Sequence, residues 1–389
     1  MLKHLLRVAV VAMTLFVNIK SYAIETTAKQ AYMIDATTGQ VLFAKNEEEK
    51  MSPSSMSKLM TCYMVFEALK NGTFKLDDKM TVSKKAWQMQ GSKMFVPVEQ
   101  QVSIEDLIRG VVVQSGNDAS VVLAEGMAGT EEEFANRLNN KAKDLGLNNS
   151  NFKNATGWPE AEHYMSAKDL VTLAQRVITD FPEYYKYFSE IEFVYNNISQ
   201  PNRNILLTRG LGVDGLKSGH TDIAGYGIVV SALRNDRRLI LVMNGLTSEE
   251  ERASEAQSLL NYGFMNFTNI DIAKTSAALL STNVWLGKLD KVNLTAKQDI
   301  IITVAADQSK SIKASANYIS PVYAPISTEE QFGTLNIQVG QEKRTIPLYA
   351  VEKVEKLSLF KKIVVWFKYL FSNWTFLPPK QQEITKIIY

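Results

Sequence analysis

Two hydrophobic periods alternate along this chain and divide it into three parts. From about Ile24 to Asn269, stretches with a helical period are mixed with stretches in which apolar and polar residues strictly alternate. Short alternating runs dominate residues 270–353, and a helical period returns in residues 354–389. The pattern predicts an α+β domain, then a small all-β domain, then a C-terminal amphipathic helix.

The first part carries signals for two hairpins and several helices. The hairpins are predicted at residues 31–35 with 40–44 and 226–233 with 238–245, each around a polar turn. The clearest helices are predicted at residues 51–72, 103–113 and 249–267. Ser103 and Asp106 form a capping box at the start of the second of these helices. We expect helices packed on an antiparallel sheet.

The second part has the short alternating strand patterns of an all-β domain. Its strands are predicted at residues 283–287, 291–296, 299–306, 311–316, 334–340 and 344–350. No arrangement of catalytic residue types occurs among them. We therefore expect this domain to act as a spacer or a binding platform.

The last part reads as a helix that lies on a membrane surface. One broad face would hold Leu357, Phe360, Ile363, Val364, Phe367, Leu370, Phe371 and Trp374. Lys361, Lys362, Lys368, Ser358 and Ser372 fall opposite, whereas Val365 and Tyr369 break the pattern. No uninterrupted apolar run is long enough to span a bilayer, so the helix is expected in the interface, with its lysines facing anionic lipid. The alternative is a helix docked on the protein's own surface.

The first 23 residues resemble an export signal. Lys3, His4 and Arg7 precede an apolar stretch, and small residues lead up to Ala23, where cleavage is expected. The alternative, an uncleaved anchor, is disfavoured because the apolar run is short.

Charge and cysteine content exclude some classes of protein. The sequence holds 43 Lys and Arg residues and 41 Asp and Glu residues; three basic residues and no acid lie in the first 23, which leaves a net charge of about −1. A nucleic-acid partner is therefore not expected. Cys62 is the single cysteine, so no internal disulfide can form despite the exported context. We expect a small buried residue there rather than a reactive thiol.

Ser55 and Lys58 are the first candidates for chemistry. Three residues apart on a helix, their side chains share a face, and the surrounding apolar pattern places Lys58 where the helix enters the core. A serine hydroxyl needs a base to become a nucleophile, and a lysine is a base only when desolvation or a second cation lowers its pKa. Pro53 fits a first helical turn, so Ser55 would lie near free backbone N–H groups that can stabilise an oxyanion.

Two further stretches could complete such a site. Ser115-Gly116-Asn117 lies between two predicted helices and offers a hydroxyl and an amide. Lys217-Ser218-Gly219-His220-Thr221 precedes a predicted strand, so we expect it at a sheet edge, where Gly219 would let a substrate backbone approach. Lys217 would provide the second cation that Lys58 requires. Each stretch alone is unspecific.

In this order, the three stretches match the Ser-x-x-Lys, Ser-x-Asn and Lys-Thr/Ser-Gly motifs of penicillin-recognising serine enzymes. The chain resembles the low-molecular-mass penicillin-binding proteins of the serine-type D-alanyl-D-alanine carboxypeptidase family. The similarity runs through "PSSMSKLMT", "LIRGVVVQSGNDAS", "NRN", "VDGLKSGHTDIAGY" and the "EA..LLNYGF" helix. It covers nearly the whole chain after the signal and implies a catalytic domain at residues 24–269, a β-rich domain at 270–353 and an anchor at 354–389.

The resemblance also implies roles for individual residues. Ser55 would attack the penultimate D-Ala carbonyl, and Lys58 would accept its proton. Ser115, Asn117 and Lys217 would relay protons and position the substrate amide. Backbone N–H groups of Ser55 and His220 would form the oxyanion hole beside Gly219. The terminal carboxylate would be held by Ser218, Thr221, Arg203 and Arg252. Ser218 stands where the family more often has threonine, and the hydroxyl is retained.

The predicted function is removal of the terminal D-Ala from peptidoglycan pentapeptide stems through a Ser55 acyl-enzyme that β-lactams would trap. No cofactor or metal is expected. The expected location is the periplasmic face of the inner membrane, and a role in wall architecture and cell shape would follow.

Three alternatives remain open. A class A β-lactamase would need an acidic residue on the loop at 154–170 that activates the deacylating water, but Glu160 and Glu162 do not form the Glu-x-x-x-Asn arrangement. A zinc peptidase is disfavoured because His163 and His220 are the only histidines after the signal. A non-catalytic membrane-tethered peptidoglycan binder should have lost one of the three motifs, and none is broken.

Overall fold

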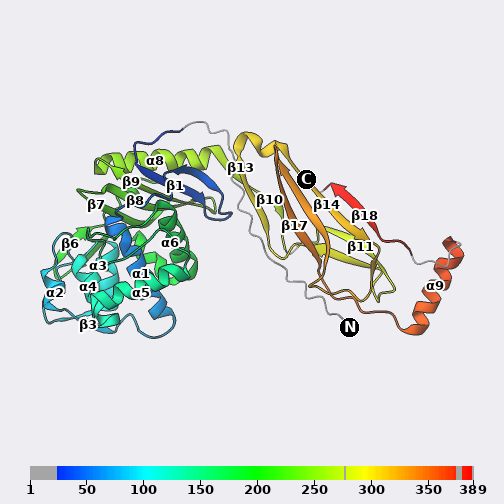
Figure 1. Ribbon diagram of the computed structural model, residues 1–389, viewed down its shortest axis with the longest axis horizontal. Coiled ribbons are helices and arrows are strands. Elements are labelled where there is room, and N and C mark those ends of the chain that lie inside the picture. Colours follow the sequence, from blue (N-terminus) through cyan, green and yellow to red (C-terminus); the bar gives the residue numbers. More distant parts are fainter. Residues whose placement is uncertain (1–23, 276, 374–378, 388–389) are drawn as a thin grey trace. The chain divides into compact units, whose positions relative to one another are not determined.

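The computed structural model describes residues 24–275, 277–373 and 379–387, which form two compact units (Figure 1). The α/β unit comprises Thr26–Lys274 and Gln298–Ser309; the β unit comprises Thr275–Lys297 and the described residues from Lys310 onward. The predicted signal peptide lies outside the described residues. The boundary predicted between residues 269 and 270 stays a prediction.

A five-stranded antiparallel sheet organises the α/β unit. Its strands, in spatial order, are β2 (Val41–Lys45), β1 (Gln30–Asp35), β9 (Arg237–Leu246), β8 (Gly225–Arg234) and β7 (Val213–Thr221). The two predicted hairpins are β1–β2 and β8–β9, which confirms both. Residues 239–246 of β9 are all buried, because α8 (Glu249–Asn266) and α6 (Ala167–Asp180) cover opposite faces of the sheet (Figure 1). This explains the nearly unbroken apolar run of that strand.

The remaining elements of this unit are short or lie around the helical core. The α-helices are α1 (Lys58–Lys70), α2 (Lys84–Gln88), α3 (Ile104–Val112), α4 (Asn117–Ala128), α5 (Glu131–Asp144) and α7 (Pro182–Tyr185). The short helical turns are η1 (Ser54–Ser57), η2 (Lys186–Ser189), η3 (Ile205–Thr208) and η4 (Ala306–Ser311). The two-stranded ladders are β3 (Lys79–Thr81) with β4 (Gln101–Ser103), β5 (Glu192–Tyr195) with β6 (Ile198–Pro201), and β10 (Phe267–Ala273) with β13 (Ile300–Ala305).

Helix α1 is buried on almost every side, so it is a core helix rather than a surface one. The sequence predicted one helix through 51–72, but the α-helix begins only at Lys58 and is preceded by the 3₁₀ turn η1 with Pro53 as its N-cap. Ser55 therefore lies in the 3₁₀ turn, where it precedes the α-helix instead of belonging to its first turn. The predicted capped helix is confirmed: Ser103 Oγ accepts from the Asp106 N–H at 3.1 Å.

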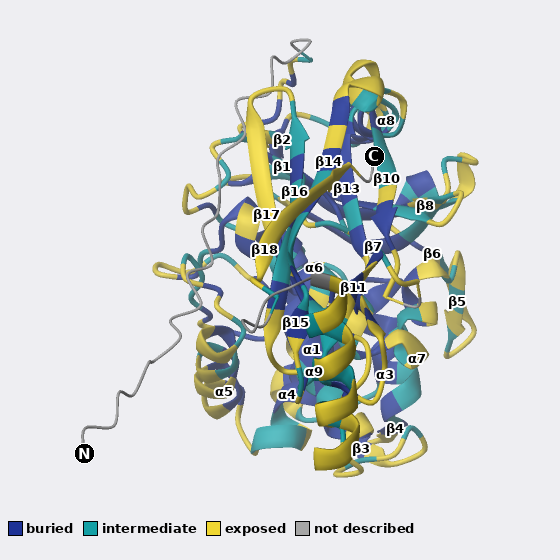
Figure 2. Cartoon of the chain, turned by 90° about the vertical axis from the view of Figure 1, so that its right-hand side faces the viewer, coloured by how far each residue is buried: buried dark blue, intermediate teal, exposed yellow. Residues whose placement is uncertain are grey.

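The β unit is a seven-stranded sheet. Its strands, in spatial order, are β15 (Val322–Tyr323), β11 (Leu280–Trp285), β12 (Lys291–Thr295), β17 (Glu342–Ala350), β16 (Gln331–Val339), β14 (Ile312–Ser320) and β18 (Gln382–Ile387). All six strands predicted for this region exist, although β13 belongs to the α/β unit. Strand β18, which the sequence did not predict, pairs antiparallel with β14, and its six residues are exposed (Figure 2).

The predicted amphipathic helix is present as α9 (Leu359–Asn373). Its residues are mostly exposed or half-buried (Figure 2). The Tyr369 ring, which breaks the apolar pattern, meets the Trp285 ring edge-on at 4.9 Å within the same unit. Trp374, predicted on the apolar face, lies outside the described residues. No helix in the described part of the chain combines the length and the hydropathy that a membrane crossing needs.

Candidate active site

The three sequence motifs meet in the α/β unit. The turn η1 and the start of α1 supply Ser55 and Lys58, and the edge strand β7 supplies Lys217. Ser115 comes from the short connection between α3 and α4, and Asn117 is the first residue of α4. The predicted position of the 217–221 stretch at a sheet edge is confirmed, and the stretch is itself part of the strand.

Lys58 is completely buried, and its Nζ atom has three oxygen partners. It lies 2.8 Å from Ser55 Oγ, 2.7 Å from Asn117 Oδ1 and 2.6 Å from the Thr156 carbonyl oxygen. Burial holds the pKa of Lys58 well below its ordinary value, and the positive charge of Lys217 lowers it further. The amine is therefore biased toward its neutral form.

The chemistry of these partners directs the lone pair of a neutral Lys58. The Asn117 Oδ1 and Thr156 oxygens can only accept hydrogen bonds, so they take the two N–H groups of a neutral amine. The Ser55 hydroxyl is the one partner of the three that can donate a proton. The neutral amine thus aims its lone pair at the hydroxyl, as a general base must.

Lys217 forms the second half of the site. Its buried Nζ donates to Ser115 Oγ at 2.8 Å and to the Ser218 carbonyl at 3.0 Å. Burial lowers the pKa of Lys217 to about 7. Asn117 belongs to the Lys58 half of the site: its Oδ1 accepts from Lys58, and its Nδ2 donates to the Gln90 carbonyl at 2.7 Å.

Strand β7 packs directly against the turn that carries Ser55. A Cβ atom at Gly219 would lie 3.0 Å from Ser54 Cβ and 3.1 Å from the Ser55 nitrogen. A side chain at Gly219 would therefore require the strand or the turn to shift by a few tenths of an ångström. Ser54 Oγ and Thr221 Oγ1 lie 3.2 Å apart and link the two segments again.

The residues predicted to bind the substrate carboxylate differ from one another in burial and in their contacts. Ser218 is buried and Thr221 half-buried on β7, whereas His220 is exposed and stacks on the Tyr226 ring at 4.0 Å. Arg252 is buried on α8, where it pairs with Glu249 at 2.5 Å and donates to the Arg203 carbonyl at 3.3 Å. Arg203 is exposed, and its carbonyl is the acceptor for Arg252, so this bond joins the two arginines to each other.

Two backbone carbonyls in this network, those of Thr156 and Gln90, were not predicted from the sequence. The loop 151–163 presents the first of them through a turn in which Asn154 Oδ1 accepts from the N–H groups of Thr156 and Gly157. Gly157 has a φ of +77°, and a Cβ there would lie 1.9 Å from the Ser54 carbonyl oxygen. An Asn followed three residues later by Gly is a usable turn signal, but it does not reveal what the turn contacts.

Cys62 is buried, as predicted, and burial raises its pKa to about 12. It therefore behaves as a small apolar residue of α1 and not as a reactive thiol.

Comparisons with known proteins agree with this geometry. Residues 17–247 match the family model described as D-alanyl-D-alanine carboxypeptidase, and residues 267–356 match the C-terminal domain of penicillin-binding protein 5. The chain is 38% identical over 356 residues to D-alanyl-D-alanine carboxypeptidase DacC of Escherichia coli, covering 89% of each chain. The structure of penicillin binding protein 5 from Haemophilus influenzae aligns with a TM-score of 0.79 at 34% identity, covering 86% of this chain and all of that one. Penicillin-Binding Protein D2 from Listeria monocytogenes, solved in an ampicillin-bound form, aligns at 27% identity over 63% of this chain and all of that one, with a TM-score of 0.58.

Proposed function

This chain belongs to the D-alanyl-D-alanine carboxypeptidase family, and we propose that Ser55 is its nucleophile and Lys58 its general base. The protein is a serine-type D-alanyl-D-alanine carboxypeptidase, a hydrolase that removes the terminal D-Ala from peptidoglycan pentapeptide stems. The assignment of roles depends above all on one observation: the buried Lys58 Nζ lies 2.8 Å from Ser55 Oγ.

In the proposed reaction, Ser55 Oγ attacks the penultimate D-Ala carbonyl while its proton passes to Lys58. The carbonyl oxygen becomes an oxyanion that the backbone N–H groups of Ser55 and His220 stabilise. The tetrahedral intermediate collapses, the bond to the terminal D-Ala nitrogen breaks, and that nitrogen takes up the proton that Lys58 had accepted, so the amine leaves and Lys58 is neutral again. Water then hydrolyses the acyl-enzyme, which restores the Ser55 hydroxyl.

The other site residues are proposed to hold the substrate and the charge balance. Ser115, 2.8 Å from Lys217 Nζ, can pass a proton between that lysine and the leaving amine. Asn117 would bind the substrate amide. Ser218, Gly219 and Thr221 would line the carboxylate end on β7, with Arg203 and Arg252 adding positive charge at longer range; both arginines lower the pKa of Lys217.

The experiment for this function follows acylation and turnover together. The purified enzyme is incubated with a peptide that ends in L-Lys-D-Ala-D-Ala, and free D-alanine is measured. A second sample is treated with benzylpenicillin, digested and analysed by mass spectrometry. We expect D-alanine release and a penicilloyl group on the peptide that contains Ser55. An adduct without release would contradict the proposed turnover, and an adduct on another residue would contradict the nucleophile.

The rate of acylation should depend on pH through Lys58. Only neutral Lys58 can accept a proton, so the second-order rate constant for a fluorescent penicillin should rise with pH until Lys58 is deprotonated. Because the charge of Lys217 lowers the pKa of Lys58, Lys217→Gln should raise that pKa and move the rise to higher pH. The difference should be largest below about pH 7, where Lys217 carries its charge. If the acylation rate constant of Lys217→Gln rises at the same pH as in the parent, or at a lower pH, this coupling is contradicted.

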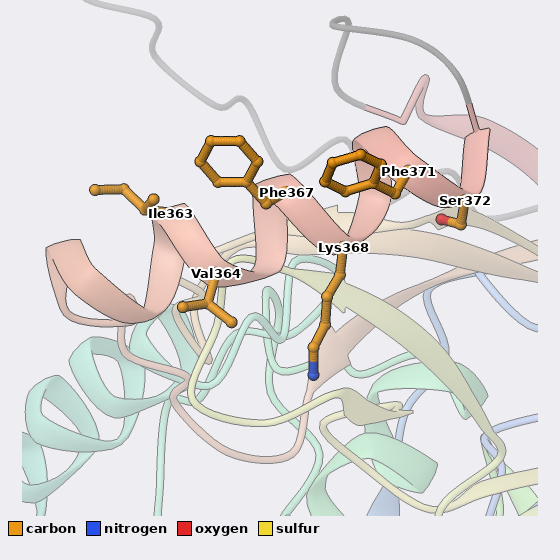
Figure 3. A pocket seen from close by; sticks show the side chains of 6 residues that line it. All are labelled: Ile363, Val364, Phe367, Lys368, Phe371 and Ser372. Atoms are coloured by element: carbon orange, nitrogen blue, oxygen red, sulfur yellow. The ribbon is translucent and has the colours of Figure 1, made fainter.

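Helix α9 supports a further proposal, that the exported protein is attached to the periplasmic face of the inner membrane. The side chains of Ile363, Phe367 and Phe371 project from one side of the helix, while Lys368 projects from another (Figure 3). Phe367 is 53% and Phe371 69% exposed, which is unusual for two neighbouring large rings. An apolar face with basic flanks fits the interface of an anionic bilayer.

Vesicle binding tests the attachment. The full chain should sediment with vesicles that contain phosphatidylglycerol, and Phe367→Ser with Phe371→Ser should weaken binding about a hundredfold, because two rings lose their burial in lipid. The control pair is Met265→Ser with Val351→Ser, which removes exposed apolar side chains elsewhere and should leave binding unchanged. Equal binding of both pairs would mean that α9 is not the anchor.

A further inference from the structure

A buried histidine lies behind the proposed nucleophile without touching it. His163 is 5% exposed, and the Phe152 ring meets it edge-on at 5.8 Å. Its Nδ1 accepts from the Lys153 N–H at 3.3 Å, so in the neutral ring the proton is on Nε2. Nε2 lies 2.9 Å from Ser57 Oγ and therefore donates to it. Burial, with a smaller effect of the Lys58 charge, lowers the pKa of His163 to about 4 and keeps the ring neutral.

Ser57 connects this histidine to the reacting groups. It is a buried residue of η1, two positions after Ser55 and directly before Lys58. A change in the position of Ser57 therefore moves the backbone that carries both catalytic side chains.

The loop that contains His163 also holds Lys58 from its other side. Within 151–163, the Thr156 carbonyl accepts from Lys58 Nζ at 2.6 Å and the Ala155 carbonyl accepts from Thr61 Oγ1 at 2.8 Å. Gly157 packs against Ser54 and Ser57, leaving no room for a side chain. These contacts lie in the middle of the loop. The bond between His163 and Ser57 fixes the same loop to η1 from its far end.

We infer that His163 is a positioning residue, which acts through Ser57 to hold the 151–163 loop against η1 so that the Thr156 carbonyl keeps Lys58 directed at Ser55. This inference depends on the proposed roles of Ser55 and Lys58. Loss of the bond lets the loop move away from η1, and the Thr156 carbonyl then holds the Lys58 amine less firmly. Acylation should slow, whereas substrate binding on β7 should change little.

A double-mutant cycle in the full-length enzyme tests the inference. The variants are His163→Leu, Ser57→Ala and both together, and the readouts are acylation by a fluorescent penicillin, kcat and KM for the D-Ala-D-Ala peptide, and thermal unfolding. We expect each single variant to slow acylation and lower kcat about tenfold with KM nearly unchanged. The double variant should be no slower than the slower single variant, because both remove the same bond. His163→Gln, whose amide N–H can replace the Nε2 donor, should recover most of the rate.

Two results would overturn the inference. One is single effects that multiply in the double variant, which would mean that the two residues act independently. The other is a Ser57→Ala enzyme that acylates within about twofold of the parent, which would mean that the bond to Ser57 does not position the site. If His163→Leu does not fold, the Ser57→Ala result decides alone. A parent enzyme that is not acylated at Ser55 would instead overturn the proposed function itself.

Discussion

Replacing Ser55 by alanine is expected to abolish D-alanine release and penicillin acylation while leaving the fold intact. Ser55 Oγ lies 2.8 Å from the buried Lys58 Nζ, and alanine removes this hydroxyl without adding bulk. Loss of an acyl-forming nucleophile typically lowers kcat by roughly 10⁴- to 10⁶-fold. D-alanine release and mass spectrometry of the benzylpenicillin-treated variant measure the effect, and thermal unfolding checks the fold.

Ser54→Ala is the matched control for that experiment. Its hydroxyl is adjacent in the chain and buried, but it lies near Thr221 Oγ1 rather than Lys58. Losing a neutral hydrogen bond is worth about 1 kcal/mol, so the control should keep its rate within about tenfold. If Ser55→Ala still releases D-alanine and Ser54→Ala is inactive, the nucleophile is Ser54 and the proposed assignment is wrong.

Lys58→Arg should cause the second largest loss of acylation rate. Lys217→Arg is the variant with which it is compared. Arginine keeps the positive charge but cannot become neutral, so it cannot serve as a base. If Lys58 takes the Ser55 proton, Lys58→Arg should slow acylation by about 10³-fold. If Lys217 acts through its charge, Lys217→Arg should cost only about tenfold.

The two arginine variants share their steric cost, since each places a guanidinium where a fully buried amine was. Acylation by a fluorescent penicillin, measured on folded protein, gives the ratio of the two effects. If Lys217→Arg is acylated more slowly than Lys58→Arg, Lys217 is the base and Lys58 acts through its charge, which reverses the proposed roles.

The sequence could predict the parts of this site that work through side chains. Ser55 with Lys58, Ser115 with Asn117, and Lys217 are recognisable because the chemistry requires those residue types at those spacings. The buried position of Lys58 also followed from the pattern of its helix. These residues come from three separate segments, and only the family resemblance suggested that the fold would bring them together.

The parts that the sequence could not predict work through the backbone or through distant partners. Thr156 and Gln90 contribute carbonyl oxygens, which every residue has, so their identity carries no signal. The contact of His163 with Ser57 joins residues 106 positions apart. Strand β18 has polar and apolar residues but no buried face, so its pairing with β14 left no hydrophobic pattern to recognise.

Strand β13 shows the same limit for larger pieces of structure. The sequence placed it correctly as a strand, but its pairing partner is β10 in the α/β unit. Thr303 of β13 donates to Asn269 Oδ1 at 2.7 Å, and its hydroxyl lies 2.5 Å from that of Thr38. Such long-range pairing depends on the whole fold and not on the local period.

The return of residues 298–309 to the α/β unit has a consequence for the order of events during synthesis. All proposed site residues lie before residue 253, so they leave the ribosome, and cross the membrane in the proposed export, well ahead of β13. The unit that holds them nevertheless lacks a strand until about residue 305 has followed, and by then the first strands of the other unit are already available. The two units are therefore completed together rather than one after the other, and neither can be exchanged between relatives as one uninterrupted stretch of gene.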